Sequence, residues 1–381
     1  MTEAFIAAAV RTPVGRRGGS LAATHPADLA ARTLEALIAS SGVDPADIDD
    51  VLLGCVAQVG AQSANIARTA WLSAGLPESV PGTTIDRQCG SSQQAVHFAA
   101  QAVRSGTADL VVAGGVEVMS SVPIGSGASA GAAAGYGEPL AGKGWRKRYG
   151  DVPIDQIRSA DMIAEKWDID RAAMDQFALT SHERALAATA DGRFTAEIVP
   201  VGGLARDEGP RTTSLEKMAS LRLLPGMNRL TAAHASQISD GAAAVLVASD
   251  AAVTRFGLTP LARVHTMAVV GSDPILMLTG PIPATAKVLE RAGLALSDIG
   301  QIEINEAFAP VVLAWQYETG AHLGLVNPYG GAIALGHPLG ATGARLMTTL
   351  THSMRANKIR YGLQVMCEGG GMANATILES V

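Results

Sequence analysis

Residues 36–54 read ALIASSGVDPADIDDVLLG, and residues 287–305 read KVLERAGLALSDIGQIEIN. Each stretch contains the end of a helix, a glycine that stops it, an Asp-Ile turn and then an apolar strand. A second similarity follows in nearly the same register, between DLVVAGG at residues 109–115 and GLQVMCEG at residues 362–369. Similarity at one offset across two pairs of elements indicates a duplicated α/β unit.

The segment between the two repeats differs from them in composition and in the periodicity of its apolar residues. Strands that alternate with helices predict parallel sheets with right-handed crossovers in the repeated parts. Residues 125–144 are instead rich in Gly, Ala and Ser without periodicity, which predicts a mobile loop, and residues 159–190 have helical spacing. A connection this long usually has a function. The predicted parts are a first α/β half (1–119 plus 241–260), an inserted loop domain (120–240) and a second α/β half (261–381).

Composition excludes several classes of protein. The chain has 381 residues, 48% of them hydrophobic and 17% charged, which describes a folded protein. Its net charge is −6 and its basic residues are scattered, which argues against nucleic acid as a partner. Three widely spaced cysteines and eight histidines without ligand spacing support neither disulfides nor a metal site. The N-terminus resembles a first strand rather than a signal peptide, and no apolar run is long enough to span a membrane, so we expect a cytoplasmic protein without membrane contact.

A cysteine lies at a predicted strand-to-helix junction. Cys89 occurs in TIDRQCGSSQQA, residues 84–95, directly before an apolar-periodic helix. The helix dipole and the unpaired amides at such an N-terminus favour a thiolate. A buried core cysteine is the alternative, and it fits Cys55 better, because Cys55 lacks this context.

A histidine lies in a second glycine-rich turn. His337 occurs in NPYGGAIALGHPLGATG, residues 327–343, and the proline that follows it suits the first turn of a helix. The surrounding glycines predict a backbone shaped around this side chain, with the ring accessible to a substrate.

Two further strand ends carry polar groups. Cys367 ends an apolar strand and enters a glycine triplet, residues 369–371, whose amides are free to face an oxyanion. Asn305 and Glu306 follow the strand that repeats residues 51–54. A buried Asn-Glu pair is costly unless it is hydrogen-bonded, so it belongs either to a structural network or to a site that holds a catalytic water.

These segments together resemble the thiolase family (acetyl-CoA acetyltransferases and 3-ketoacyl-CoA thiolases), from Val10 to the C-terminus. The cysteine block, Asn-Glu-Ala-Phe, Gly-His-Pro and Cys-x-Gly-Gly-Gly follow one another in the order typical of that family. The resemblance implies a thiolase-like α/β fold of two duplicated halves in five layers, αβαβα, with a loop domain inserted in the first. It also implies CoA-dependent cleavage of 3-oxoacyl-CoA to acetyl-CoA and a shortened acyl-CoA, or the reverse Claisen condensation.

The same resemblance implies a role for each site residue. Cys89 would be the nucleophile that takes up the acyl group, and His337 would deprotonate it and help to bind the thioester oxygen. Cys367 would be the acid/base at the α-carbon of acetyl-CoA. Asn305 would hold a water in one oxyanion hole, while the amides of Cys89 and Gly369 would form the other. A Claisen step requires separate groups to carry the acyl chain and to move the α-proton, and each developing oxyanion needs its own donors.

The substrate-binding part matches the family less closely. TAAHAS at residues 231–236 stands where short-chain biosynthetic thiolases have TAGNAS, which predicts that Ser236 contacts the pantetheine arm of CoA and that Phe308 packs nearby. Residues 155–158 lack the His-Met pair that acetoacetyl-CoA enzymes carry over the acyl pocket. Together with Gln93 and its neighbours, this favours degradative bacterial thiolases, including actinobacterial ones of lipid or steroid breakdown.

Two alternatives remain at the level of sequence. One is a ketosynthase-like condensing enzyme of the same superfamily, which has no need for a second thiol such as Cys367. The other is a catalytically silent acyl-CoA- or lipid-binding protein, which the combination of Cys89, His337 and Cys367 disfavours. The resemblance implies no bound cofactor, coenzyme A as co-substrate, and a homodimer or homotetramer.

Overall fold

The computed structural model describes residues 2–381, whose strands pair into a ten-stranded mixed sheet. The strand order is β4-β3-β5-β6-β1-β7-β10-β9-β8, with the short β2 paired to β6. The strands are Ala4–Arg11 (β1), Gly15–Arg16 (β2), Asp50–Gly54 (β3), Gly82–Ile85 (β4), Leu110–Val118 (β5), Ser239–Ser249 (β6), Ala262–Gly271 (β7), Gln301–Ile304 (β8), Tyr361–Glu368 (β9) and Met372–Glu379 (β10).

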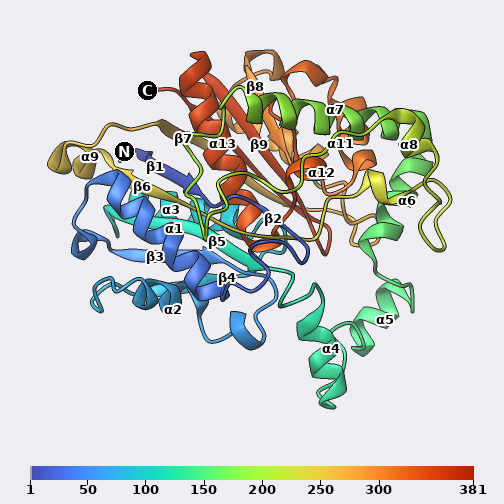
Figure 1. The fold of residues 1–381 in the computed structure, drawn as a ribbon, viewed down its shortest axis with the longest axis horizontal. Coiled ribbons are helices and arrows are strands. Elements are labelled where there is room, and N and C mark those ends of the chain that lie inside the picture. The colour runs from blue at the N-terminus through green and yellow to red at the C-terminus, as the bar shows by residue number, and fades with distance from the viewer. Residues whose placement is uncertain (1) are drawn as a thin grey trace.

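The helices alternate with these strands in both halves of the chain (Figure 1). They are Pro26–Ser41 (α1), Ile66–Ser73 (α2), Ser91–Ser105 (α3), Ser126–Ala133 (α4), Lys143–Tyr149 (α5), Gln156–Lys166 (α6), Arg171–Ala190 (α7), Leu215–Ala219 (α8), Asp250–Phe256 (α9), Pro281–Ala292 (α10), Ala309–Thr319 (α11), Ala332–Leu335 (α12) and Thr342–Asn357 (α13).

The order of elements confirms the predicted duplication. The first half runs α1, β3, α2, β4, α3, β5, β6, and the second runs α10, β8, α11, α13, β9, β10. The strands that carry the sequence repeats correspond, because β3 lies beside β5 in one half and β8 beside β9 in the other. Where the first half has β4, the second has a single parallel bridge from Ile302 to Val326.

The packing of the helices confirms the layered α/β architecture. Helices α1 and α2 cover the outer face of the first-half strands, and α10 and α11 cover that of the second-half strands. Helices α3 and α13 contact each other and, between them, strands of both halves, so they form the central layer. Among residues 2–381, the two halves of the sheet are hydrogen-bonded to each other only through β1 and β7, over the pairs Phe5–Arg263 and Ile6–Ala262.

The prediction of parallel strands is correct for only part of the sheet. Strands β3, β4 and β5 are parallel, as are β8 and β9. Strands β1, β6, β7 and β10 pair antiparallel. A tight turn can join antiparallel neighbours, and Gly370 and Gly371, both with positive φ, make such a turn between β9 and β10. No crossover helix is needed there.

The long connection between β5 and β6 contains the helices α4 to α8. Helices α6 and α7 confirm the helical spacing of residues 159–190. The prediction of a mobile loop at residues 125–144 is wrong where α4 and the start of α5 lie, whereas residues 134–142 form the non-helical connection between them. These two helices project away from the body of the molecule (Figure 1). They bury no side chain, which explains why the sequence shows no hydrophobic periodicity.

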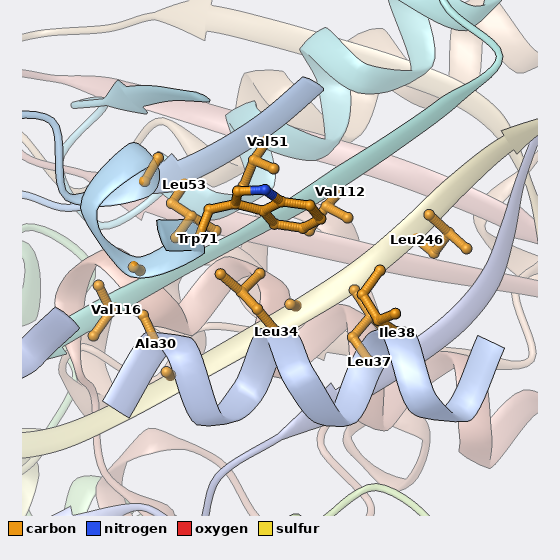
Figure 2. Close-up of a cluster of buried hydrophobic side chains, with 14 of the residues drawn as sticks. Ala30, Leu34, Leu37, Ile38, Val51, Leu53, Trp71, Val112, Val116 and Leu246 are labelled. Atoms are coloured by element: carbon orange, nitrogen blue, oxygen red, sulfur yellow. The ribbon is translucent and has the colours of Figure 1, made fainter. Parts of the chain in front are cut away.

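We expect Trp71→Ala to lower the free energy of unfolding by about 3–5 kcal/mol. The Trp71 ring is fully buried between α1 and the sheet, among Leu34, Val51 and Val112 (Figure 2), so its removal leaves a cavity in a close-packed core. Denaturant unfolding monitored by circular dichroism measures the effect. Its neighbour Leu72 is 41% exposed, and Leu72→Ala is the control that should change stability by about 0.5 kcal/mol at most. Equal losses in the two variants would contradict this account of the core.

Candidate active site

Cys89 lies in the sharp turn between β4 and α3, as its sequence context predicted. Gly90 is the residue before the first turn of α3, and Gln88 has a positive φ of 50°, which directs the chain abruptly from strand to helix. The side chain of Cys89 is buried in a small apolar cluster with Met119 and Leu339. The backbone N–H groups of Gly369 and of Cys89 itself are directed at its sulfur.

Burial of Cys89 opposes the thiolate that the helix start favours. Burial raises the pKa of the Cys89 thiol well above its ordinary value, and the neighbouring Cys367 and Glu368 raise it further. The two backbone N–H groups act in the opposite direction but do not outweigh burial. The thiol is therefore neutral at physiological pH, and it needs a base before it can attack.

The imidazole of His337 is suited to act as that base. Burial lowers its pKa to about 3, with Arg345 contributing, so the ring is uncharged at neutral pH. The Thr342 hydroxyl donates to the Pro338 carbonyl oxygen (2.8 Å), so at 2.6 Å from His337 Nδ1 it has to accept the Nδ1 proton. This assigns the lone pair to Nε2, which accepts a hydrogen bond from Asn305 Nδ2 at 3.4 Å.

Asn305 connects the histidine to the second thiol. Its amide nitrogen lies 3.9 Å from Cys367 Sγ, at the end of β9, as well as 3.4 Å from His337 Nε2. Its Oδ1 is buried and has no hydrogen-bond partner within residues 2–381. Burial raises the pKa of Cys367 to about 12, although the Asn305 amide opposes the shift. The amide thus presents a donor to both groups and leaves one acceptor free for a further molecule.

The loop that carries His337 is pinned to strands of the first half. Glu117 on β5 accepts hydrogen bonds from the N–H groups of Val56 (2.9 Å), Ala57 (3.1 Å) and Gly340 (2.9 Å). A Cβ atom on Gly340 would lie 2.7 Å from the Gly54 carbonyl oxygen, so this approach requires glycine. The glycines therefore bring the loop close to the strands, and His337 is only 4% exposed, which corrects the prediction of an open ring.

Sequence reasoning missed Glu117. Its signal is a single carboxylate within an otherwise apolar strand, VVAGGVEV, where an unpaired charge would be very costly. Cys55, which we predicted as a core residue, is fully buried, and its sulfur lies 3.9 Å from the same carboxylate.

The neighbour of Asn305 belongs to a structural network. Glu306 accepts hydrogen bonds from Ser181 Oγ (2.7 Å), Asn327 Nδ2 (2.8 Å) and the N–H of Ile333 (3.2 Å). These contacts join α7 and the loop before α12 to the end of β8. Glu306 therefore belongs to a structural network, whereas Asn305 lies beside His337 and Cys367.

The two predicted CoA-binding residues lie next to each other in the fold. The N–H of Ser236 donates to the Ala307 carbonyl oxygen (2.9 Å), and Ala235 forms an antiparallel bridge with Phe308. Phe308 is buried and packs in the same apolar cluster as Cys367, whereas Ser236 is half-buried. His234, which precedes them, bonds to Asp175 at 2.7 Å and closes its own turn.

Within residues 2–381, no group of three or more His, Cys, Asp or Glu side chains is arranged to hold a metal ion. None of the helices in this described part of the chain has the length and apolar character needed to cross a membrane.

Comparison with known proteins agrees with this geometry. Residues 4–251 match the family model "Thiolase, N-terminal domain", and residues 258–380 match "Thiolase, C-terminal domain". A steroid 3-ketoacyl-CoA thiolase of Mycobacterium tuberculosis (FadA6) is 56% identical over the whole chain and 94% of that protein. A 3-oxoadipyl-CoA/3-oxo-5,6-dehydrosuberyl-CoA thiolase of Escherichia coli K12 is 44% identical over the full length of both proteins.

A solved structure shows the same fold. The acetyl-CoA acetyltransferase of Bacillus anthracis superposes with a TM-score of 0.88 at 35% identity, over 100% of this chain and 99% of that one. Fold and relatives together define an acyltransferase. The chain belongs to the thiolase family.

Proposed function

We propose that the protein cleaves 3-oxoacyl-CoA with free CoA, or runs the reverse condensation, through an acyl group carried on Cys89. The observation that carries this proposal is the position of the Asn305 amide, 3.4 Å from the neutral His337 Nε2 and 3.9 Å from Cys367 Sγ. An uncharged imidazole base and a separate thiol acid are the two proton carriers that a Claisen reaction requires.

The proposed cycle starts with proton transfer from the Cys89 thiol to His337 Nε2. The sulfur attacks the 3-keto carbon while the N–H groups of Cys89 and Gly369 stabilise the oxyanion. The bond between C2 and C3 breaks, and Cys367 protonates the departing enolate, which leaves as acetyl-CoA. Asn305 holds a water against the enolate oxygen. The Cys367 thiolate then takes the proton of a second CoA thiol, whose sulfur attacks the acyl-Cys89 thioester. His337 returns its proton to the departing Cys89 sulfur as the shortened acyl-CoA forms, which restores both thiols and the uncharged imidazole.

The proposed substrates are 3-oxoacyl-CoA esters from a degradative route, with acyl groups larger than acetoacetyl. The names of the relatives support this class, since they describe a steroid 3-ketoacyl-CoA thiolase and a 3-oxoadipyl-CoA/3-oxo-5,6-dehydrosuberyl-CoA thiolase. Ser236 and Phe308 are the residues that we propose for the pantetheine arm. We further propose a cytoplasmic homodimer or homotetramer without a bound cofactor, divided into the halves 1–119 plus 241–260 and 261–381 and the inserted domain 120–240.

We expect CoA-dependent loss of the 3-oxoacyl-CoA enolate absorbance, with kcat/KM rising from acetoacetyl-CoA toward bulkier acyl groups. The assay uses a panel of acetoacetyl, medium-chain, long-chain, 3-oxoadipyl and steroid-derived thioesters. Activity confined to acetoacetyl-CoA would contradict the degradative assignment, which rests on the missing His-Met pair at residues 155–158. Absence of turnover on every ester, with retained CoA binding, would instead indicate the silent acyl-CoA-binding protein.

A further inference from the structure

A third ionisable group lies beside the two thiols. Glu368 is the last residue of β9 and directly follows Cys367 in the chain. Its side chain is fully buried, and neither carboxylate oxygen has a hydrogen-bond partner within residues 2–381. A buried carboxyl group without partners is costly when charged, so it requires an explanation.

The carboxyl group of Glu368 packs directly on the turn that carries the nucleophile. A Cβ atom added to Gly90, the residue after Cys89, would meet Glu368 Oε1 at 1.8 Å, so a larger residue there would have to displace the carboxyl group. Glu368 therefore lies against the residue that follows one thiol and is covalently adjacent to the other. A negative charge at this place raises the pKa of both Cys89 and Cys367.

One cation faces this carboxyl group. Arg87 precedes the nucleophile turn and lowers the pKa of Glu368, but the two side chains form no ion pair within 4 Å in the described chain. The Arg87 Nη1 group instead lies 3.7 Å from Met372 Sδ. Burial outweighs the attraction of Arg87 and raises the pKa of Glu368 to about 8. The carboxyl group thus changes its charge close to physiological pH, with Arg87, Cys89 and Cys367 as the ionisable groups around it.

We propose that Glu368 is a positioning residue that controls the ionisation of both thiols: its neutral carboxyl permits thiolate formation at Cys89 and Cys367, and its carboxylate opposes it. This inference rests on the proposed function for its meaning in catalysis, but thiol ionisation can be measured without turnover. Below pH 8, Glu368 keeps its proton and the thiols ionise more readily. Above pH 8, its negative charge moves their ionisation to higher pH.

The first test uses the wild-type protein. We expect the rate of Cys89 alkylation by iodoacetamide, followed by peptide mass spectrometry from pH 6 to pH 10, to rise with hydroxide concentration, flatten around pH 8, and rise again. The flattening marks the titration of a group that interacts with the thiol. A single unbroken rise would overturn the proposal.

The second test compares two matched amide variants. Glu368→Gln keeps the shape of the side chain but never carries a charge, so its profile should lack the flat region and lie about tenfold above wild type at pH 9.5, equivalent to about one pKa unit. Glu303→Gln is the control. Glu303 on β8 is equally buried, also has an unpartnered oxygen and a pKa raised to about 8, but the charged groups that act on it are Arg345, Glu306 and Glu197, and neither thiol is among them. Its Cys89 profile should match wild type.

The outcomes separate this proposal from the proposed function. An active thiolase whose Glu368→Gln profile equals that of wild type refutes the role of Glu368 alone. An inactive protein that nevertheless shows the flat region near pH 8 in wild type, and loses it in Glu368→Gln, retains this inference and refutes the proposed reaction. A Glu368→Gln profile displaced to higher pH contradicts the electrostatic argument itself.

Discussion

Cys89→Ala is expected to abolish thiolysis, with a loss in kcat of at least about 10⁴-fold, because the proposed cycle carries the acyl chain on Cys89 and uses Cys367 only to move a proton. Covalent labelling should disappear with activity. The measurement combines the enolate absorbance assay with intact-protein mass spectrometry after incubation with acyl-CoA. The wild-type protein should gain the mass of one acyl group, and the variant should gain none.

Cys55→Ala is the matched control for this experiment. Cys55 is also a buried thiol, but it lies in the apolar core beside Glu117 and outside the group formed by Cys89, His337 and Cys367. The variant should keep wild-type labelling and turnover, with a small loss of stability from the missing sulfur. If Cys89→Ala retained an acyl adduct, or Cys55→Ala lost it, the assignment of the nucleophile would be wrong.

Cys367→Ala is expected to separate the two halves of the reaction. Cys89 and His337 remain, so Cys89 should still become acylated by acyl-CoA. The group that protonates the enolate is missing, so thiolysis of 3-oxoacyl-CoA and the reverse condensation should fall by about 10²–10⁴-fold. Intact mass after acyl-CoA incubation reports acylation, and the absorbance assay reports carbon–carbon cleavage in the same preparation.

The Cys367→Ala variant also distinguishes between the alternative roles of this thiol. A ketosynthase-like enzyme needs no second thiol, so full turnover in Cys367→Ala would favour that alternative. Loss of both acylation and cleavage would indicate that Cys367 supports the geometry around Asn305, whose amide lies 3.9 Å from its sulfur, instead of moving a proton. Thermal unfolding of Cys367→Ala distinguishes a local change around Asn305, which leaves the unfolding transition intact, from misfolding of the whole chain.

Much of the architecture could be predicted from local patterns. The repeated Asp-Ile turns at residues 47–48 and 298–299 start equivalent strands, because glycine stops and apolar runs act over a few residues. The positions of Cys89 before α3 and of Cys367 at the end of β9 also followed from neighbouring residues alone. The antiparallel pairing of β6 with β5 and of β10 with β7 could not be predicted in this way, because strand partners depend on contacts between distant segments.

The sequence by itself determined the duplicated α/β plan, the family resemblance and the candidates for the reactive groups, because short motifs and their order carry all three. Only the tertiary structure decided the charge state of those candidates. Cys89 is neutral because burial outweighs the amides at the helix start, and His337 presents the lone pair of Nε2 because its Nδ1–H donates a hydrogen bond to the Thr342 hydroxyl. Only the tertiary structure also brings the proposed positioning residue Glu368 beside Cys89. Burial and Coulomb interactions depend on distances between segments far apart in the chain, and folding alone sets those distances.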